Sequence, residues 1–387
     1  MQIQELEPFL LHVPVTGAGV ADSMHRITHW GVPGVKVILD NGLEGFGFAG
    51  THAHLPTDRL IAGFIDQVCR PLLVGEPFGP SSSDVDRLTD KIFRYPPSQW
   101  LGRAGLTHVA LGAVNIALWD LAAKQADQPL WKLLRQHRTA GSDVPQEETP
   151  EPLVAYNTDI GWLDRTVDQL TENAKRACHE EGFRAVKMKV GKPDLSDDIA
   201  RVAAVRRAIG DDVTLMVDAN GKWDLATASA AAPQLADAGV AWVEEPLWYD
   251  DVAAHAELAK VGNPAVAIGE QLYNVYEFSN FMRAGAVHVV QPDVTRLCGV
   301  SEWCAVTDAA LAAGLSVVAH AGDMGQVHVH TSYAYREVRW FEYIPWIRRC
   351  FVEPMTAREG LVDLPQLPGA GTTLRKDAVE RFGKPWR

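Results

Sequence analysis

The sequence has few cysteines, and no two of them stand close together as a pair. Five occur in 387 residues, at positions 69, 178, 298, 304 and 350, and there is no Cys-x-x-Cys motif. An odd number of scattered cysteines is typical of a reduced intracellular protein and disfavours both a disulfide framework and a thiolate zinc site. We therefore expect the protein to be cytoplasmic.

The sequence also lacks long apolar runs and a surplus of positive charge. No apolar run approaches the roughly 20 residues that cross a bilayer, and no basic segment precedes an apolar one at the N-terminus. There are 36 Lys and Arg against 49 Asp and Glu, which gives a formal net charge of −13. We therefore expect no membrane partner and no nucleic-acid partner. An anionic substrate would then need a local cation, such as a bound metal ion.

The length and the hydrophobic content indicate one large domain and a smaller one. The hydrophobic fraction of 47% is enough for a large core. Residues 136–152 form a polar linker with three prolines, at 145, 150 and 152, and we place the domain boundary there. This predicts a mixed helix-and-strand domain at 1–135, completed by about 354–387, and a second domain at 153–353.

Beyond the linker, strand-like runs alternate with helical ones, which is typical of βα units and a parallel sheet. Eight such runs occur, at 153–156, 186–190, 215–218, 241–244, 267–270, 287–291, 315–319 and 338–342. Eight is the number of a closed α/β barrel, whose active site lies at the carboxyl ends of the strands. An open doubly wound sheet is the competing architecture, but no glycine-rich dinucleotide turn follows any of these runs.

Three acidic residues end three consecutive strand-like runs. Asp218, Glu244 and Glu270 follow one another at intervals of 26 residues, close to the roughly 30 residues that one βα unit of a barrel occupies. They should therefore meet at one rim, where an all-carboxylate set suits Mg²⁺. Solvated acids at strand ends are the alternative explanation, and the regular spacing argues against it.

Two lysines precede the three acids in the sequence, and a possible Asp-His dyad follows them. Lys187 and Lys189 share one face of an apolar strand, so both should point into the barrel mouth. A buried amine beside other cations and a metal ion loses its proton more easily, which makes such a lysine a candidate base. Asp293 and His320 stand on the next two units, and an Asp that accepts the imidazole N–H would fix the tautomer of the ring.

Joined in order, these motifs resemble a known family. The set comprises Lys-x-Lys at 187–189, Asp-x-Asn at 218–220, Glu-Glu-Pro at 244–246, Gly-Glu at 269–270, Gln-Pro-Asp at 291–293, His320 and Glu342. It resembles the enolase superfamily and, within it, the mandelate racemase subgroup, over nearly the whole chain. The resemblance implies a modified (β/α)8-type barrel with an α+β capping domain built from the N-terminal region and the last residues. It also implies an even-numbered homo-oligomer.

The resemblance also implies residue roles in removing the proton α to a carboxylate. Asp218, Glu244 and Glu270 match the Mg²⁺ ligands; Lys189 matches the base on one face of the α-carbon; Lys187 matches the lysine that neutralises the substrate carboxylate; Asn220 matches an auxiliary polar contact; His320 with Asp293 matches the dyad on the other face; and Glu342 matches the acid that hydrogen-bonds the enolate. Such a site stabilises the enediolate formed when the proton leaves.

Within this family we expect dehydration of a sugar acid, an aldonate or an aldarate, to a 2-keto-3-deoxy acid. The turn at 321–326 is polar and rich in small residues, and the N-terminal loops offer His25, His29, His52, His54 and Arg26 to substrate hydroxyls. Packing of these loops explains the same residues equally well. Racemisation or epimerisation of a 2-hydroxy acid is the alternative outcome for such a site.

Three other functions are less favoured by the sequence. A muconate-type cycloisomerase resembles this chain less, because that branch has a lysine on the strand of Asp293 and lacks the histidine dyad. A metal-dependent hydrolase would place a His-x-His pair early in the barrel, whereas the pairs here are His52/His54 and His328/His330. The complete set of lysines, dyad and Glu342 argues against a non-catalytic sugar-acid binder.

Overall fold

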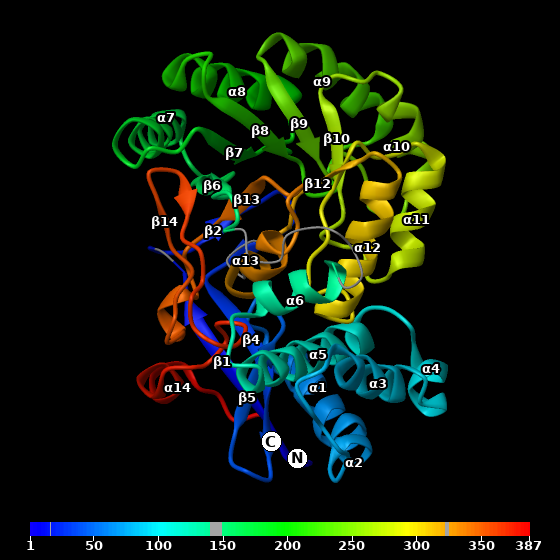
Figure 1. Ribbon diagram of the computed structural model, residues 1–387. Helices are drawn as coiled ribbons and strands as arrows, with labels where there is room; N and C mark the ends of the chain where they lie inside the picture. The colour runs from blue at the N-terminus through cyan, green and yellow to red at the C-terminus, as the bar shows by residue number, and fades with distance from the viewer. Residues whose placement is uncertain (16, 140–148, 322–324) are drawn as a thin grey trace.

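The computed structural model describes residues 1–15, 17–139, 149–321 and 325–387. Much of the expected linker at 136–152, and Gly322, Asp323 and Met324 of the expected turn, lie outside these ranges. The described chain forms a barrel, seen at the top of Figure 1, and a cap of helices and strands beneath it. The predicted fold class is confirmed.

The cap is built on a three-stranded antiparallel sheet in the order β1-β4-β5. Its strands are β1 (Ile3–Pro14), β4 (His29–Leu39) and β5 (Glu44–Phe48), with a separate small ribbon of β2 (Val20–Ala21) and β3 (Arg26–Ile27). The helices of the cap are α1 (Leu55–Phe64), α2 (Arg70–Leu73), α3 (Ser82–Phe93), α4 (Pro96–Leu101), α5 (Leu106–Gln125) and α6 (Leu130–Thr139). A π-helical turn (Ile65–Cys69) joins α1 to α2.

Helix α5 is the core of the cap. All of its residues from Thr107 to Ala123 are buried, and it packs so closely on β5 that a Cβ at Gly47 would lie 1.9 Å from the Ala113 carbonyl oxygen. By length and composition it is the one described helix apolar enough to cross a membrane, although polar residues interrupt its apolar run. Because 94% of its apolar window is buried inside the protein, α5 has the character of a core helix.

The second domain is a closed barrel of eight parallel strands, as predicted. The strands are β6 (Val154–Gly161), β7 (Ala185–Lys189), β8 (Thr214–Asp218), β9 (Val240–Glu244), β10 (Ala265–Ile268), β11 (Val289–Val290), β12 (Ser316–Val317) and β13 (Trp340–Tyr343). Neighbours in sequence pair in parallel from β6 to β12. Strand β13 pairs with β6, and a bridge between Ala319 and Phe341 closes the ring.

Helices surround the barrel on the outside (Figure 1). They are α7 (Val167–Lys175), α8 (Leu195–Ile209), α9 (Leu225–Asp237), α10 (Val252–Ala259), α11 (Val275–Ala284) and α12 (Val300–Ala312). The following helix, α13 (Gly325–Tyr333), differs from these because every one of its residues is buried. It contacts α6 of the cap as well as β13 and α12 of the barrel.

The C-terminal segment returns to the cap. After a hairpin of β14 (Ala357–Arg358) and β15 (Leu361–Val362), the chain ends in α14 (Lys376–Phe382). A bridge joins Leu11 of β1 to Gly383, and the Lys384 N–H donates to the Leu10 carbonyl over 2.9 Å. In Figure 1, α14 lies beside the cap strands, close to both termini. We propose that the cap comprises 1–135 with about 354–387 and the barrel 153–353.

His330 of α13 should make the stability of the protein depend on pH. Its buried Nδ1 accepts the Trp131 N–H of α6 over 3.3 Å, which ties cap to barrel. Burial lowers the pKa of His330 to about 3, against about 6.5 in the unfolded chain. The unfolded state therefore binds more protons below pH 6.5, so stability is full above that pH and falls as the pH drops toward 3.

We expect His330 to remove about 2 kcal/mol of stability between pH 6.5 and pH 5. The measurement is the free energy of unfolding from urea titrations at pH 5 and pH 7 for the natural protein and for His330→Gln, which cannot titrate. The variant should lose less stability over this interval. Equal losses would show that other groups dominate.

Candidate active site

The predicted residues converge at the carboxyl ends of the barrel strands. Lys187 and Lys189 lie in β7, Asp218 ends β8, Glu244 ends β9 and Glu342 lies in β13. Glu270, Asp293 and His320 follow β10, β11 and β12 within three residues. Parallel strands bring these ends to one rim because each returning helix restarts the chain at the opposite rim.

Asp218, Glu244 and Glu270 form a compact group of possible metal ligands. One carboxylate oxygen from each lies within 4.8 Å of the others, and the residues are only 0%, 1% and 8% exposed. Burial, reinforced by the neighbouring carboxylates and opposed by Lys187, raises the pKa of Glu244 to about 7. Three buried carboxylates repel one another, and oxygen is the ligand that Mg²⁺ prefers. The residues present therefore fit a magnesium ion.

The two lysines neutralise this group in different ways. Lys187 is fully buried, and its Nζ lies 2.6 Å from Glu244 Oε1 and 2.8 Å from Glu342 Oε1. The Nζ of Lys189 lies 2.5 Å from Asp218 Oδ2 and 5.5 Å from the centre of the Trp162 ring. Of the two, only Lys189 lines the cavity described below.

The expected loss of basicity at Lys189 assumes a metal ion nearby, and it stays a prediction. Burial and the neighbouring Lys187 favour the neutral amine, but the carboxylates of Asp218, Glu270 and Asp22 outweigh them and raise the pKa of Lys189. The direct ion pair with Asp218, which spacing along the chain does not specify, opposes the effect of nearby cations. A neutral Lys189 therefore requires another positive charge, which would offset the carboxylates around it.

His320 and Asp293 lie together, as the sequence predicts. His320 Nδ1 is 2.8 Å from Asp293 Oδ2, and Nε2 is 3.0 Å from Glu270 Oε2. Burial disfavours the charged imidazole, but the Glu270 carboxylate and the hydrogen bond to Asp293 prevail and raise the pKa of His320. Because Asp293 binds the Nδ1 atom of His320, the Nε2 atom faces the cluster of possible metal ligands through Glu270.

Several residues that hold this set in place have a role that the sequence did not predict. His328 Nε2 lies 2.9 Å from Asp293 Oδ1, and the Thr158 hydroxyl donates to Glu342 Oε1 over 2.8 Å. The Gln291 amide donates to Glu244 Oε2 over 2.7 Å. Thr158 was missed because β6 extends to Gly161, beyond the run identified at 153–156. Nothing in the sequence marks His328, since its position follows from the burial of α13.

A cavity of about 370 Å³ opens between the strand ends and the cap loops. Lys189, Asn220, Glu270, His320 and Glu342 line it, while Lys187, Asp218, Glu244 and Asp293 do not. From the cap, His25, His52 and His54 line it, as expected. Arg26 and His29, also expected to reach substrate, are exposed and lie outside the lining.

The wall of this cavity on the cap side is aromatic and polar together. The His52 ring lies 4.4 Å from that of His25 and 5.3 Å from that of Trp30, in edge-on contacts. Trp162 and Trp346 of the barrel stack at 5.1 Å and continue this wall. Imidazole nitrogens can bind hydroxyls while indole faces cover the C–H side of a sugar chain.

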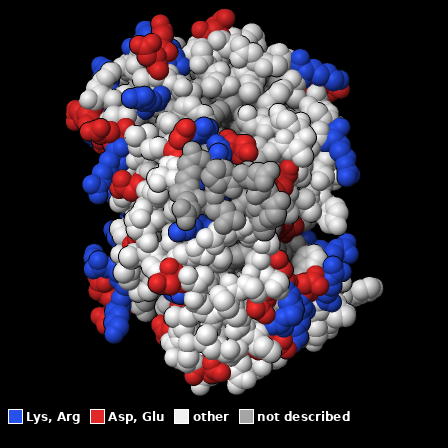
Figure 2. Space-filling view, viewed as in Figure 1, with Lys and Arg blue, Asp and Glu red and all other residues white. Residues whose placement is uncertain are grey.

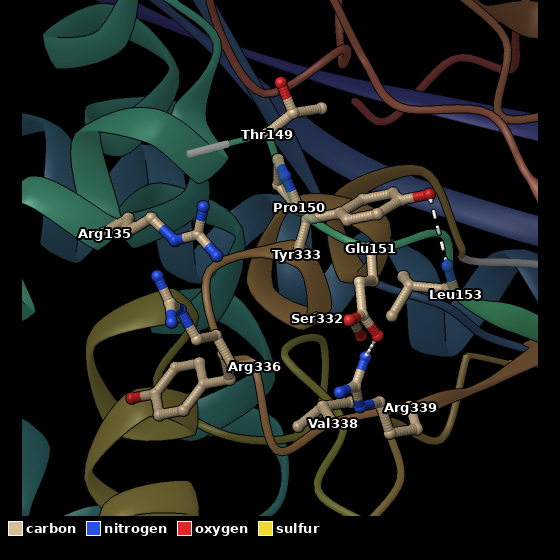
Figure 3. Close-up of a pocket in the computed structure, with 11 residues that line it drawn as sticks. Arg135, Thr149, Pro150, Glu151, Leu153, Ser332, Tyr333, Arg336, Val338 and Arg339 are labelled. Atoms are coloured by element: carbon tan, nitrogen blue, oxygen red, sulfur yellow. Dashed lines mark hydrogen bonds and ion pairs between the residues drawn. The ribbon is translucent and has the colours of Figure 1, made fainter. Parts of the chain in front are cut away.

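Another cavity, of about 130 Å³, lies at the opposite end of the barrel. Its lining includes Leu153, just before β6, and Arg339, just before β13. Figure 3 shows Arg135 and Arg336 pointing toward each other across it, with Arg339 paired to Glu151. None of the predicted catalytic residues lines this cavity.

One further group of possible metal ligands occurs among the described residues. His108, Cys298 and Glu302 bring one ligand atom each within 4.8 Å of the others, where the cap meets the barrel. The Glu302 carboxylate already accepts the N–H groups of Cys298 and Val275, over 3.0 and 3.1 Å. This anchoring of two loops explains the glutamate without a metal, so we assign no function to the group.

Two family models match most of the chain. Residues 7–135 match the N-terminal domain of the mandelate racemase and muconate lactonizing enzymes. Residues 169–378 match the enolase C-terminal domain-like model. The first match covers much of the cap, and the second covers most of the barrel and part of the C-terminal return.

Individual proteins show the same relationship. The chain is 32% identical to L-talarate/galactarate dehydratase from Salmonella typhimurium, over 95% of this chain and 87% of that protein. It is 33% identical to 3,6-anhydro-alpha-L-galactonate cycloisomerase from Streptomyces coelicolor, over 90% of each. A racemase from Streptomyces coelicolor, crystallised with magnesium, superposes with a TM-score of 0.87 at 29% identity, over 99% of this chain and 100% of that one.

Proposed function

Because this chain belongs to the enolase superfamily, in the group of mandelate racemase and muconate lactonizing enzymes, we propose that it is a Mg²⁺-dependent sugar acid dehydratase. It removes the proton α to the carboxylate of an aldonate or aldarate and expels the C3 hydroxyl as water. The product is a 2-keto-3-deoxy acid. The observation that supports this best is that Lys189 and His320 line the same cavity and both contact the cluster of possible metal ligands.

The carboxylates of Asp218, Glu244 and Glu270 would hold the metal. When bound there, Mg²⁺ supplies positive charge against the negative charge that develops on the substrate carboxylate. The same charge would offset the carboxylates that now raise the pKa of Lys189 and so favour its neutral, proton-accepting form.

Lys189 and His320 then perform the two proton transfers. The Lys189 Nζ accepts the C2 proton, and His320, oriented by Asp293, donates a proton to the C3 hydroxyl as the C–O bond breaks. The resulting enol becomes the 2-keto acid by taking a proton at C3. Glu342, held by Thr158 and Lys187, donates a hydrogen bond to the enolate in its protonated form, because an ionised carboxylate can only accept one. Asn220 contacts the substrate from the cavity wall.

Two further outcomes remain for the same first step. An epimerase would return a proton to C2 from the His320 side, and a structurally similar protein is a racemase. A cycloisomerase would let a second group of the substrate close or open a ring, and one relative has that name. Dehydration is favoured by the three cap histidines on the cavity, which suit a chain bearing several hydroxyl groups.

The test is a screen of aldonates and aldarates with Mg²⁺, followed by a carbonyl reagent and by proton NMR in D₂O. We expect a 2-keto-3-deoxy product from at least one acid, and loss of turnover when a chelator removes the metal. Deuterium incorporation at C2 with inversion and no keto product would identify an epimerase instead. A product that isomerises without loss of water would identify a cycloisomerase.

We also propose a cytoplasmic location and a homo-oligomeric assembly. No disulfide joins any of the five cysteines in the described part of the chain, and three of them are buried. On the face seen in Figure 2, acidic and basic side chains are interspersed. Fractionation and sedimentation measurements test these two proposals directly.

A further inference from the structure

The cavity contains a second basic side chain besides Lys189. Arg296 lines it, three residues beyond Asp293 in the loop that follows β11. No ion pair joins its guanidinium to any residue within the described ranges, whereas Lys189 is engaged by Asp218. A guanidinium cannot lose its proton at physiological pH, so this wall of the cavity stays positively charged.

Hydrogen bonds to Asp293 fix the backbone at Arg296. Its N–H donates to the Asp293 carbonyl over 3.1 Å, and the Thr295 N–H and hydroxyl both donate to Asp293 Oδ1, over 2.7 and 2.8 Å. Thr295 and Leu297 on either side are buried, at 2% and 0% exposed. The same aspartate that orients His320 thus also fixes the backbone that carries Arg296.

Arg296 and Lys189 stand on opposite sides of the barrel mouth. Lys189 is on β7 and Arg296 follows β11, the second and sixth of the eight strands of the ring. Arg296 and the cap residue His52 both line the cavity. His52 is partly exposed to solvent, but the cap and the barrel rim surround much of its ring. This burial lowers the pKa of His52, and the nearby positive charges of His25 and Arg296 lower it further. Arg296 therefore places a permanent positive charge on the side of the cavity opposite Lys189.

We propose that Arg296 binds the second carboxylate of a dicarboxylic sugar acid, so that the substrates are aldarates in preference to aldonates. This inference rests on the proposed function. One carboxylate lies with the metal-ligand group and Lys189, and the far carboxylate forms a charge-assisted, bidentate pair with the guanidinium. An aldonate carries a neutral CH₂OH at that end and leaves the arginine without a partner.

The experiment compares hexarate and hexonate pairs of the same configuration, such as galactarate and galactonate, with the full-length protein and Mg²⁺. We expect kcat/KM to be about 100-fold higher for the aldarate, as for a close charge pair in a partly buried site. Arg296→Gln should reduce this ratio about 100-fold, and Arg296→Lys, which keeps the charge but loses the fork, should restore part of it. Arg26→Gln, an arginine outside the cavity, is the matched control.

A binding measurement separates this proposal from the proposed function. Calorimetry with galactarate and Mg²⁺ should show weaker binding to Arg296→Gln than to the natural protein, whether or not turnover occurs. Turnover of aldonates as fast as aldarates, or equal galactarate binding by both proteins, would overturn the role of Arg296 and leave dehydration standing. No turnover of any sugar acid, with galactarate binding still dependent on Arg296, would refute the dehydratase and keep the carboxylate subsite.

Discussion

Replacing Lys189 with alanine is expected to lower kcat for the sugar acid about 10³-fold, in line with the usual contribution of a positioned general base. The same variant should lose the exchange of the C2 proton with solvent deuterium, because Lys189 is the base in the proposed mechanism. Its Nζ is the one lysine amine that lines the cavity among the described residues. Keto-acid formation and C2 exchange, measured by NMR in D₂O, test both losses together.

The control for Lys189 must separate catalysis from metal binding, because its Nζ lies 2.5 Å from Asp218. Removing a cation beside a metal ligand should leave Mg²⁺ affinity unchanged or raise it, which calorimetry measures. Lys260→Ala, whose exposed side chain pairs with Glu257, should behave as the natural protein. A Lys189→Ala protein with full activity would show that another group takes the proton.

Replacing His320 with asparagine is expected to separate the two halves of the reaction. Keto-acid formation should fall about 10²- to 10³-fold, the range for loss of a general acid, because His320 assists departure of the C3 hydroxyl. Exchange of the C2 proton should persist, because Lys189 remains on the other side of the substrate. Asparagine keeps a polar group near Asp293, which lies 2.8 Å from the imidazole.

His29→Asn is the matched control for His320, since His29 is an exposed cap histidine outside the cavity. Unchanged keto-acid formation in His320→Asn would exclude this histidine as the acid. Equal losses of product formation and C2 exchange would show that His320 acts in proton abstraction itself. Loss of inversion at C2, with no keto product from either protein, would instead assign it to an epimerase.

The sequence alone determined the kind of fold and most of the chemical groups at the strand ends. Alternating β and α runs favour a parallel sheet because a helix that crosses back over the sheet starts the next strand at the same end as the one before. Since all such strands have their carboxyl ends at one rim, acids at 218, 244 and 270 are brought to that rim whatever path the connecting loops take. For the same reason Asp293 and His320, on adjacent units, came within hydrogen-bonding distance.

Only the tertiary structure decided how these groups are charged and what surrounds them. The pKa of Lys189 depends on its distance to Asp218, which no spacing along the chain specifies. His328 reaches Asp293 because α13 turns into the core, and Arg296 faces the cavity because its neighbours are buried. The cap histidines were separated into those that line the cavity and those that do not by the packing of loops on the rim. Ligand types and strand order follow from local pattern, whereas electrostatics and substrate contacts depend on distances between segments far apart in sequence.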